Sequence, residues 1–101
     1  MNESAVIMVR IYLTEGEHRL KDLITRLHDV EQVKGLTVFR GITGFGKSGK
    51  LHSSTLLDIS LDLPLVIEFF DTPERAAAIM EHLSETLEPG HMVSWPAAVN
   101  S

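Results

Sequence analysis

The chain contains no cysteine among its 101 residues. Disulfide bridges and thiolate metal sites are therefore excluded, which fits a reducing compartment. Long apolar stretches are also missing, because no run reaches the ~18 residues that a membrane-spanning helix needs. The first residues lack the basic start and the cleavage pattern of a signal peptide. We therefore expect a cytoplasmic protein that does not insert into a membrane.

Positive charge is scarce as well. Nine Lys and Arg residues stand against fourteen Asp and Glu residues, which gives a formal net charge of -5. Nucleic-acid binding depends on a basic surface that neutralises phosphates, so we expect no nucleic-acid partner. The few basic residues are nevertheless clustered, with Arg40, Lys47, Lys50 and His52 uninterrupted by any acidic residue. Such a cluster is typical either of a binding loop or of a loop that is merely solvated.

The first forty residues predict a strand, a helix and a second strand. Residues 5–13 form a nearly continuous apolar run rich in β-branched side chains, typical of a strand buried on both faces except at Arg10. Residues 36–42 alternate in polarity and predict another strand. Between them, Thr14 and Glu17 have capping-box spacing, and apolar residues recur at helical intervals before Gly35, a natural helix stop: Leu20, Leu23, Ile24, Leu27, Val30 and Val33.

The second half of the chain predicts another strand, helix and strand after an irregular stretch at 44–62. Residues 61–70 read as a strand with Pro64 at its entry, and residues 91–99 as a last strand that Pro96 confines to an edge or an end. The helix between them has a strong start at residues 71–74, where a cap, a proline and acidic residues coincide. Its predicted inner face comprises Ala76, Ile79, Met80, Leu83 and Leu87.

The element order βαββαβ predicts one domain spanning residues 1–101 with an α+β fold. At this length, with 44% apolar residues, the chain is sufficient for one small core. The order most simply gives a ferredoxin-like sandwich, in which a four-stranded antiparallel sheet carries two helices on one face.

The strands nevertheless predict two apolar sheet faces. In the first strand, Met8 and Tyr12 oppose Val9 and Ile11, and later Phe69 opposes Phe70. A monomer would then expose more apolar surface than soluble monomers usually tolerate. We therefore expect the open face to pack against other subunits; the alternative is that residues 51–62 cover it.

Residues 41–54 (GITGFGKSGKLHSS) hold four glycines and two lysines. Gly44, Gly46 and Gly49 spell G-x-G-x-x-G, and residues 44–50 spell G-x-x-x-x-G-K, with Leu51 where a P-loop has Ser or Thr. Both matches are weak, because no helix begins inside the glycine run and the chain is too short for a P-loop fold. Glycine backbone N–H groups and nearby lysines can still hold an anion, although a long hairpin also uses glycine and lysine for flexibility and solubility.

Several motifs together resemble the PII-like relatives of the nitrogen-regulatory PII signalling family, in particular the DUF190 group. The likeness spans residues 6–95. It rests on Gly35-Leu36-Thr37-Val38, Arg40-Gly41-Ile42, Gly44-Phe45-Gly46, Ser48-Gly49, His52 and Asp62-Leu63-Pro64, with Glu68 in the strand that follows.

The resemblance implies a homotrimer of ferredoxin-like subunits whose sheets face inward, with a flexible loop at about 43–62. In PII proteins such a loop contacts target proteins, often transporters or metabolic enzymes, and adenine nucleotides bind in clefts between subunits. Carried over, Thr37 would lie near the base and sugar, and Gly44 and Gly46 near the phosphates. The implied ligand-binding set is Thr37, Gly44, Phe45, Gly46, Lys47, Gly49, Lys50 and His91, and the implied partner-binding loop contains Lys47, Ser48, Lys50 and His52.

Three departures from the PII pattern bear on the ligand. Leu65 and Ile67 follow Pro64 where PII has lysines, and residues 88–91 (EPGH) replace a glycine-rich run with a lysine. The C-terminal arginines of PII have no counterpart in residues 95–101. ATP, a less charged ligand such as AMP, another anion and no nucleotide at all therefore remain alternatives.

Other residue patterns suggest no catalytic or metal site. The five histidines show no i, i+3 or i, i+4 pair, so we assign no metal ligands, although a trimer can gather three copies of one histidine at its axis. His18, His28 and His82 read as solvent-facing, whereas His52 and His91 are candidate pH or anion sensors. No nucleophile has a base and an orienting acid beside it. Glu68 is expected to pair with Arg10 across the sheet.

We therefore predict a non-catalytic, regulatory PII-like signalling protein without a cofactor. It would bind a small-molecule effector, with an adenine nucleotide as one candidate, and signal to a partner protein through the loop. Two alternatives stay open: a trimeric adaptor without a small ligand, and a CutA-like metal-binding trimer.

Overall fold

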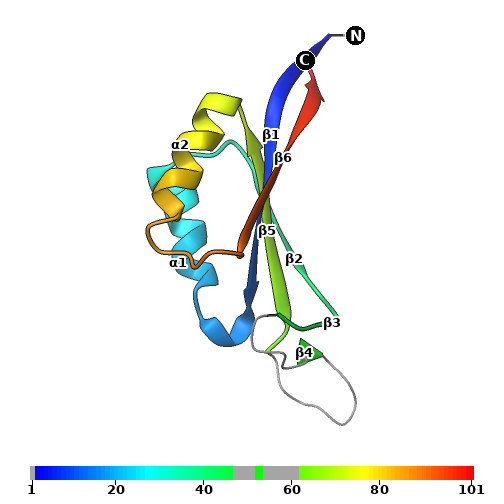
Figure 1. The fold of residues 1–101 in the computed structure, drawn as a ribbon, viewed down its shortest axis with the longest axis vertical. Coiled ribbons are helices and arrows are strands. Elements are labelled where there is room, and N and C mark those ends of the chain that lie inside the picture. The colour runs from blue at the N-terminus through cyan, green and yellow to red at the C-terminus, as the bar shows by residue number, and fades with distance from the viewer. Residues whose placement is uncertain (1, 47–51, 54–61) are drawn as a thin grey trace.

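The computed structural model describes residues 2–46, 52–53 and 62–101, with backbone only at 52–53. Its main feature is a four-stranded antiparallel sheet with strand order β2-β5-β1-β6. The strands are β1 (Glu3–Thr14), β2 (Leu36–Arg40), β5 (Pro64–Asp71) and β6 (Met92–Asn100). This order and the helices on one face of the sheet (Figure 1) confirm the predicted α+β ferredoxin-like sandwich.

A second, two-stranded sheet lies where the glycine-rich stretch begins. Strands β3 (Thr43–Gly44) and β4 (His52–Ser53) pair antiparallel, with Gly44 opposite His52. The strand predicted over 36–42 therefore ends at Arg40, and the strand predicted from residue 61 is seen from Pro64. One residue beyond the last pair, Arg40 with Leu65, the Gly41 N–H still donates to the Pro64 carbonyl over 2.7 Å.

The helix predicted after Thr14 starts later than the sequence pattern indicates. Glu17 accepts a hydrogen bond from the Thr14 N–H over 2.7 Å, so the predicted capping residues do interact. They cap a single 3₁₀ turn, η1 (Glu15–Glu17), because His18 adopts a left-handed conformation with φ 54°. Helix α1 then runs over Leu20–Thr25 and continues as a π-helical segment, η2 (Arg26–Val30).

The end of this helical segment is stabilised from the second helix. The left-handed residue is Gln32, with φ 58°, and not Gly35 as predicted. The Arg75 guanidinium donates to the Glu31 carbonyl over 2.7 Å and to the Gln32 carbonyl over 3.3 Å. Carbonyls at a helix end lack intrahelical partners, so this contact takes the place of a glycine cap.

Helix α2 (Pro73–Leu83) follows the prediction closely. The Thr72 side chain accepts from the Arg75 N–H over 3.3 Å, with Pro73 in the first turn. Four predicted inner-face residues are buried and Met80 packs against them. Together with the inner sheet face they form one core, whose buried members are Val9, Ile11, Leu13, Leu23, Leu27, Leu65, Ile67, Phe69, Ala76, Ile79, Leu83 and Leu87.

The opposite face of the sheet carries exposed apolar side chains, as the sequence pattern predicted. Four of them are 41–48% exposed: Tyr12, Phe39, Phe70 and Val93. Their register places them on one surface, since Phe39 lies opposite Val66 and Val93 opposite Arg10. We call this surface the open face. Among the described residues, no helix is long and apolar enough to cross a membrane.

Candidate functional site

A cavity of about 1050 Å³ lies at the end of the sheet where β1 ends, β5 begins and β6 begins. Its walls come from the end of β1, the turn η1, the glycine-rich stretch, the start of β5 and the turn before β6. The lining residues are Tyr12, Leu13, Thr14, Glu17, Gly41, Thr43, Gly44, Phe45, Gly46, Pro64, Leu65, Val66, Glu88, Pro89, Gly90 and His91. We call it the loop-root cavity.

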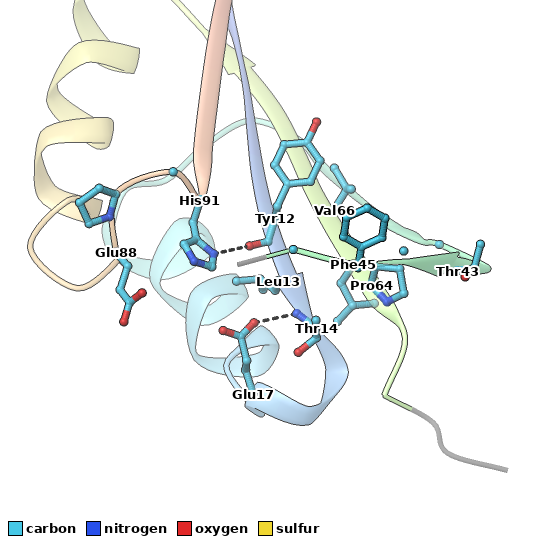
Figure 2. Close-up of a pocket in the computed structure, with 16 residues that line it drawn as sticks. Tyr12, Leu13, Thr14, Glu17, Thr43, Phe45, Pro64, Val66, Glu88 and His91 are labelled. Atoms are coloured by element: carbon cyan, nitrogen blue, oxygen red, sulfur yellow. Dashed lines mark hydrogen bonds between the residues drawn. The ribbon is translucent and has the colours of Figure 1, made fainter. Parts of the chain in front are cut away.

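Polar side chains gather on one side of this cavity. In Figure 2, Glu17, Glu88 and His91 lie on one side, and Phe45, Pro64 and Thr43 on the other. His91 is held by two contacts with Tyr12: its carbonyl accepts from the Tyr12 N–H over 2.8 Å, and its Nδ1 lies 3.0 Å from the Tyr12 carbonyl oxygen. The imidazole is thereby oriented by the backbone of β1.

The glycines on the other side permit close packing against Pro64. A Cβ atom on Gly41 would lie 2.7 Å from Pro64 Cγ, and one on Gly44 would lie 3.3 Å from it. The Phe45 ring is 72% exposed and borders the cavity. An apolar ring beside a glycine-rich backbone suits a ligand with a flat apolar part and an anionic part.

The described lining has an unusual charge for an anion site. It contains two carboxylates, Glu17 and Glu88, together with His91, and none of the described lining residues is Lys or Arg. Each further negative charge on a ligand would therefore meet repulsion from these carboxylates.

Four of the predicted ligand-binding residues lie together in the loop-root cavity: Gly44, Phe45, Gly46 and His91. Thr37 does not join them. The predicted residues Lys47, Ser48, Gly49 and Lys50 lie outside the described part of the chain, and of His52 only the backbone is described, in β4 opposite Gly44.

Thr37 lines a second cavity of about 610 Å³ on the open face, together with Gly35, Glu68 and Phe70. Thr37 pairs with Glu68 on β5, whereas Gly41 contacts Pro64, four residues earlier on the same strand. Four residues of strand span about 13 Å. The two predicted halves of the site are therefore separate cavities within one chain.

Four further lining residues were not predicted from the sequence: Tyr12, Glu17, Pro64 and Glu88. They come from segments far apart in the sequence, and only the sheet register brings them to one place. Two signals pointed toward them: the capping box placed Glu17 on a turn directly after the first strand, and Pro89-Gly90 predicted a turn before the last.

Arg10 and Glu68 form the predicted pair across the open face. Arg10 Nε lies 2.6 Å from Glu68 Oε2, and the guanidinium carbon lies 5.3 Å from the centroid of the Trp95 ring. Hydrogen bonds to Glu68 and to Tyr12 raise the pKa of Arg10. The side chain is accordingly a permanent cation on this face.

Within the part of the chain that the structure describes, no three His, Asp or Glu side chains form a group that could hold a metal ion. His18, His28 and His82 are exposed, as predicted. His82 Nδ1 also lies 3.1 Å from Oε1 of the buried Glu31 carboxylate.

The strand order and the two helices on one face of the sheet define the ferredoxin-like class, and in this chain a glycine-rich stretch leaves β2 beside the cavity. The chain belongs to the DUF190 family, whose model, described as "Uncharacterized ACR, COG1993", matches residues 6–99. A UPF0166 protein of Aquifex aeolicus (strain VF5) is 33% identical over 82 residues, covering 81% of this chain and 83% of the relative.

Two solved structures have the same fold. One is CPII, a nitrogen regulatory PII-like protein from Thiomonas intermedia K12, bound to ADP, AMP and bicarbonate. It superposes with a TM-score of 0.68 at 22% identity, over 97% of this chain and 89% of that one. The other is a PII-like signaling protein (TTHA0516) from Thermus thermophilus, with a TM-score of 0.60 at 22% identity, over 98% and 91% of the two chains. The fold and the PII-like resemblance predicted from sequence are confirmed.

Proposed function

We propose that this chain is a non-catalytic PII-like regulatory protein that binds an adenine nucleotide at the loop-root cavity and signals through residues 43–62. The observation that carries the proposal is the cavity itself, which is walled by Gly44, Phe45 and Gly46 where the glycine-rich stretch begins. A ligand held there contacts the root of the segment that would meet a partner. Ordering that root is the physical means of signalling.

The binding unit in this proposal is a homotrimer. The open face presents apolar side chains that a second copy would cover, and Arg10 and Glu68 supply a compensated charge pair within it. Thr37 and Gly44 line separate cavities in one chain. A nucleotide that contacts both would therefore use Thr37 of one copy and the glycines of its neighbour.

The ligand proposed is AMP or ADP in preference to ATP. The binding of ADP and AMP by CPII supports the choice of an adenine nucleotide. The carboxylates of Glu17 and Glu88 disfavour additional phosphates. Lys47, Gly49 and Lys50 are proposed to complete the ligand contacts, and His91 to sense the charge of the ligand.

The proposed partner is a transporter or a metabolic enzyme in the cytoplasm, contacted through Lys47, Ser48, Lys50 and His52. A basic segment on an acidic protein would favour an acidic partner surface.

Isothermal titration calorimetry and melting curves with AMP, ADP, ATP and cyclic AMP test this function. At about 100 times its dissociation constant, a ligand adds about 2.7 kcal/mol to the free energy of unfolding, a shift of several degrees. Binding of none of the four would contradict the proposal and favour the adaptor, whereas a melting temperature raised only by divalent metal would favour the CutA-like alternative. The Lys47→Ala/Lys50→Ala variant separates a sensor, which loses ligand affinity, from an adaptor, which loses only its partner.

A further inference from the structure

The turn η1 contacts both ends of the segment that leaves β2 and returns at β5. We call Arg40 and Gly41 the outgoing stem, and Asp62 and Leu63 the returning stem. Glu15 contacts both stems, Gly16 contacts the returning stem, and Glu17 lines the loop-root cavity. A single short turn therefore touches both stems and the cavity wall at once.

The outgoing stem is held by an ion pair. The Glu15 carboxylate pairs with the guanidinium of Arg40, the last residue of β2. Glu15 is well shielded, with a side-chain exposure of 17%, whereas Arg40 is 64% exposed. Neither residue lines the loop-root cavity, so the pair acts on the stem and not on a ligand.

The returning stem is held by hydrogen bonds to the backbone of the same turn. The Gly16 N–H donates to Asp62 Oδ1 over 2.6 Å, and the Glu15 N–H donates to the Leu63 carbonyl over 2.9 Å. A Cβ atom at position 16 would lie 2.6 Å from Asp62 Oδ1. Glycine is therefore needed for the contact, and a methyl group there would displace a side-chain carboxylate without forcing the backbone apart.

The same turn reaches the cavity through Glu17, whose carboxylate accepts from the Thr14 N–H over 2.7 Å. Both residues line the cavity. The residues that follow these contacts in the chain line the cavity: Gly41 follows Arg40, and Pro64 follows Leu63. The Gly41 N–H donates to the Pro64 carbonyl, so the two sides are joined at the cavity wall.

We propose that η1 is a coupling element: it holds both stems through Glu15 and Gly16, and thereby sets the position of the cavity walls and the affinity for nucleotide. Glu15, Gly16, Arg40 and Asp62 are positioning residues, since none of them lines the cavity. The inference rests on the proposed function for its ligand. By reciprocity, a bound nucleotide stabilises the same stem contacts.

The first test compares Gly16→Ala with the wild-type protein by calorimetry with AMP and ADP. The variant should bind both about three- to tenfold more weakly, because the displaced Asp62 carboxylate releases the returning stem. The urea midpoint, measured alongside, should change little, since the methyl group meets the end of a side chain. Unchanged affinity would overturn the inference and leave the proposed function intact.

The second test uses the ion pair of the outgoing stem. Glu15→Gln and Arg40→Gln should each weaken AMP binding about two- to fivefold, and the double variant no further, because they remove one interaction. The reversed pair, Glu15→Arg with Arg40→Glu, should recover affinity. The matched control is Glu81→Gln, which removes an exposed carboxylate of α2 that does not line the cavity. Additive losses, or no recovery in the reversed pair, would contradict the coupling role.

A third measurement separates this inference from the proposed function. Trypsin cleavage after Lys47 and Lys50, followed by mass spectrometry without ligand, should be about threefold or more faster in Gly16→Ala and Glu15→Gln than in wild type and Glu81→Gln. If the wild-type protein binds no nucleotide, the proposed function fails, and faster cleavage still supports the hold of η1 on the stems. Equal cleavage rates in all four proteins would overturn the inference that η1 holds the two stems.

Discussion

Arg10 and Glu68 lie directly opposite each other in the register of β1 and β5, with Arg10 Nε 2.6 Å from Glu68 Oε2. Their side chains are 40% and 20% exposed, on a face otherwise rich in apolar groups. A charge pair in such a position keeps an apolar surface soluble while allowing a second copy to cover it, because neither charge would then be buried alone.

Arg10→Met should lower the melting temperature by the same amount at pH 7 and pH 9. Hydrogen bonds to Glu68 and Tyr12 raise the pKa of Arg10 in the folded state. The stability that charged Arg10 contributes is therefore fully present below the pKa of the unfolded state, and it is lost only as the pH rises through the raised pKa of the folded state. Differential scanning calorimetry measures this, with Lys21→Met as the control for a lost exposed cation. If the loss of melting temperature in Arg10→Met differs between pH 7 and pH 9, the loss does not come from the charge of Arg10.

Phe70→Glu should convert the proposed homotrimer to monomers. Phe70 is 45% exposed on the open face, and the new carboxylate would lie in the same strand as Glu68, so a second copy would have to bury an unpaired charge. Light scattering after gel filtration should give three times the chain mass of 11.2 kDa for the wild type and 11.2 kDa for the variant. Val30→Glu, at an exposed apolar position on the helical side, should keep the wild-type mass. A variant that keeps the larger mass would exclude the open face as the contact.

Arg75→Met should destabilise the fold by about 1.5–3 kcal/mol in urea denaturation. The guanidinium donates to two carbonyls at the end of the first helical segment and pairs with the mostly buried Asp71 carboxylate over 3.0 Å. Arg19→Met removes a single exposed bond to the Thr86 carbonyl and should cost under about 1 kcal/mol. Equal losses in the two variants would show that capping by Arg75 contributes little.

Gly41→Ala should destabilise the protein by about 1–3 kcal/mol, because its methyl group would lie 2.7 Å from the ring of Pro64. The proline ring is closed onto the backbone nitrogen of β5 and therefore has little freedom to move. The matched control is Gly46→Ala, where an added Cβ meets no heavy atom within 4 Å. Urea midpoints compare the two variants, and a Gly41→Ala protein as stable as Gly46→Ala would contradict the close approach of the two stems.

Glu88→Gln should raise the affinity for ADP about two- to fivefold relative to AMP, because one fewer carboxylate faces the second phosphate. Calorimetry with both nucleotides gives the ratio. Glu85→Gln, an exposed residue outside the cavity lining, should leave the ratio unchanged. An equal gain for both nucleotides would show that the carboxylate does not distinguish the number of phosphates.

The local patterns in the sequence predicted most of the fold. The apolar run at 5–13 and the cap at Thr72 identified β1 and the start of α2, because an apolar run and a capping pattern are both formed by residues that are neighbours in the sequence. The first helical segment was predicted less well. His18 takes a left-handed conformation that ends the first turn, and the Arg75 guanidinium supplies the cap near Gln32, which no pattern within residues 14–35 reveals.

The site was predicted in part for the same reason. Gly44, Phe45 and Gly46 adjoin one another, so a motif found them, and His91 follows a recognisable turn. Glu17 joins them only through the pairing of β1 with β5 and β6, and Thr37 is separated from them by the length of β5 between Pro64 and Glu68.

The strand order also determines how the chain must fold. Within the four-stranded sheet, the pair nearest in sequence joins Arg40 to Leu65, 25 residues apart, and β1 meets β6 through pairs from Ile11 with Met92 to Glu3 with Asn100. Such non-local pairing is typical of domains that fold in milliseconds to seconds. During synthesis β1 is made before its neighbour β6, so one edge of β1 stays without its partner until residues 92–100 have been synthesised.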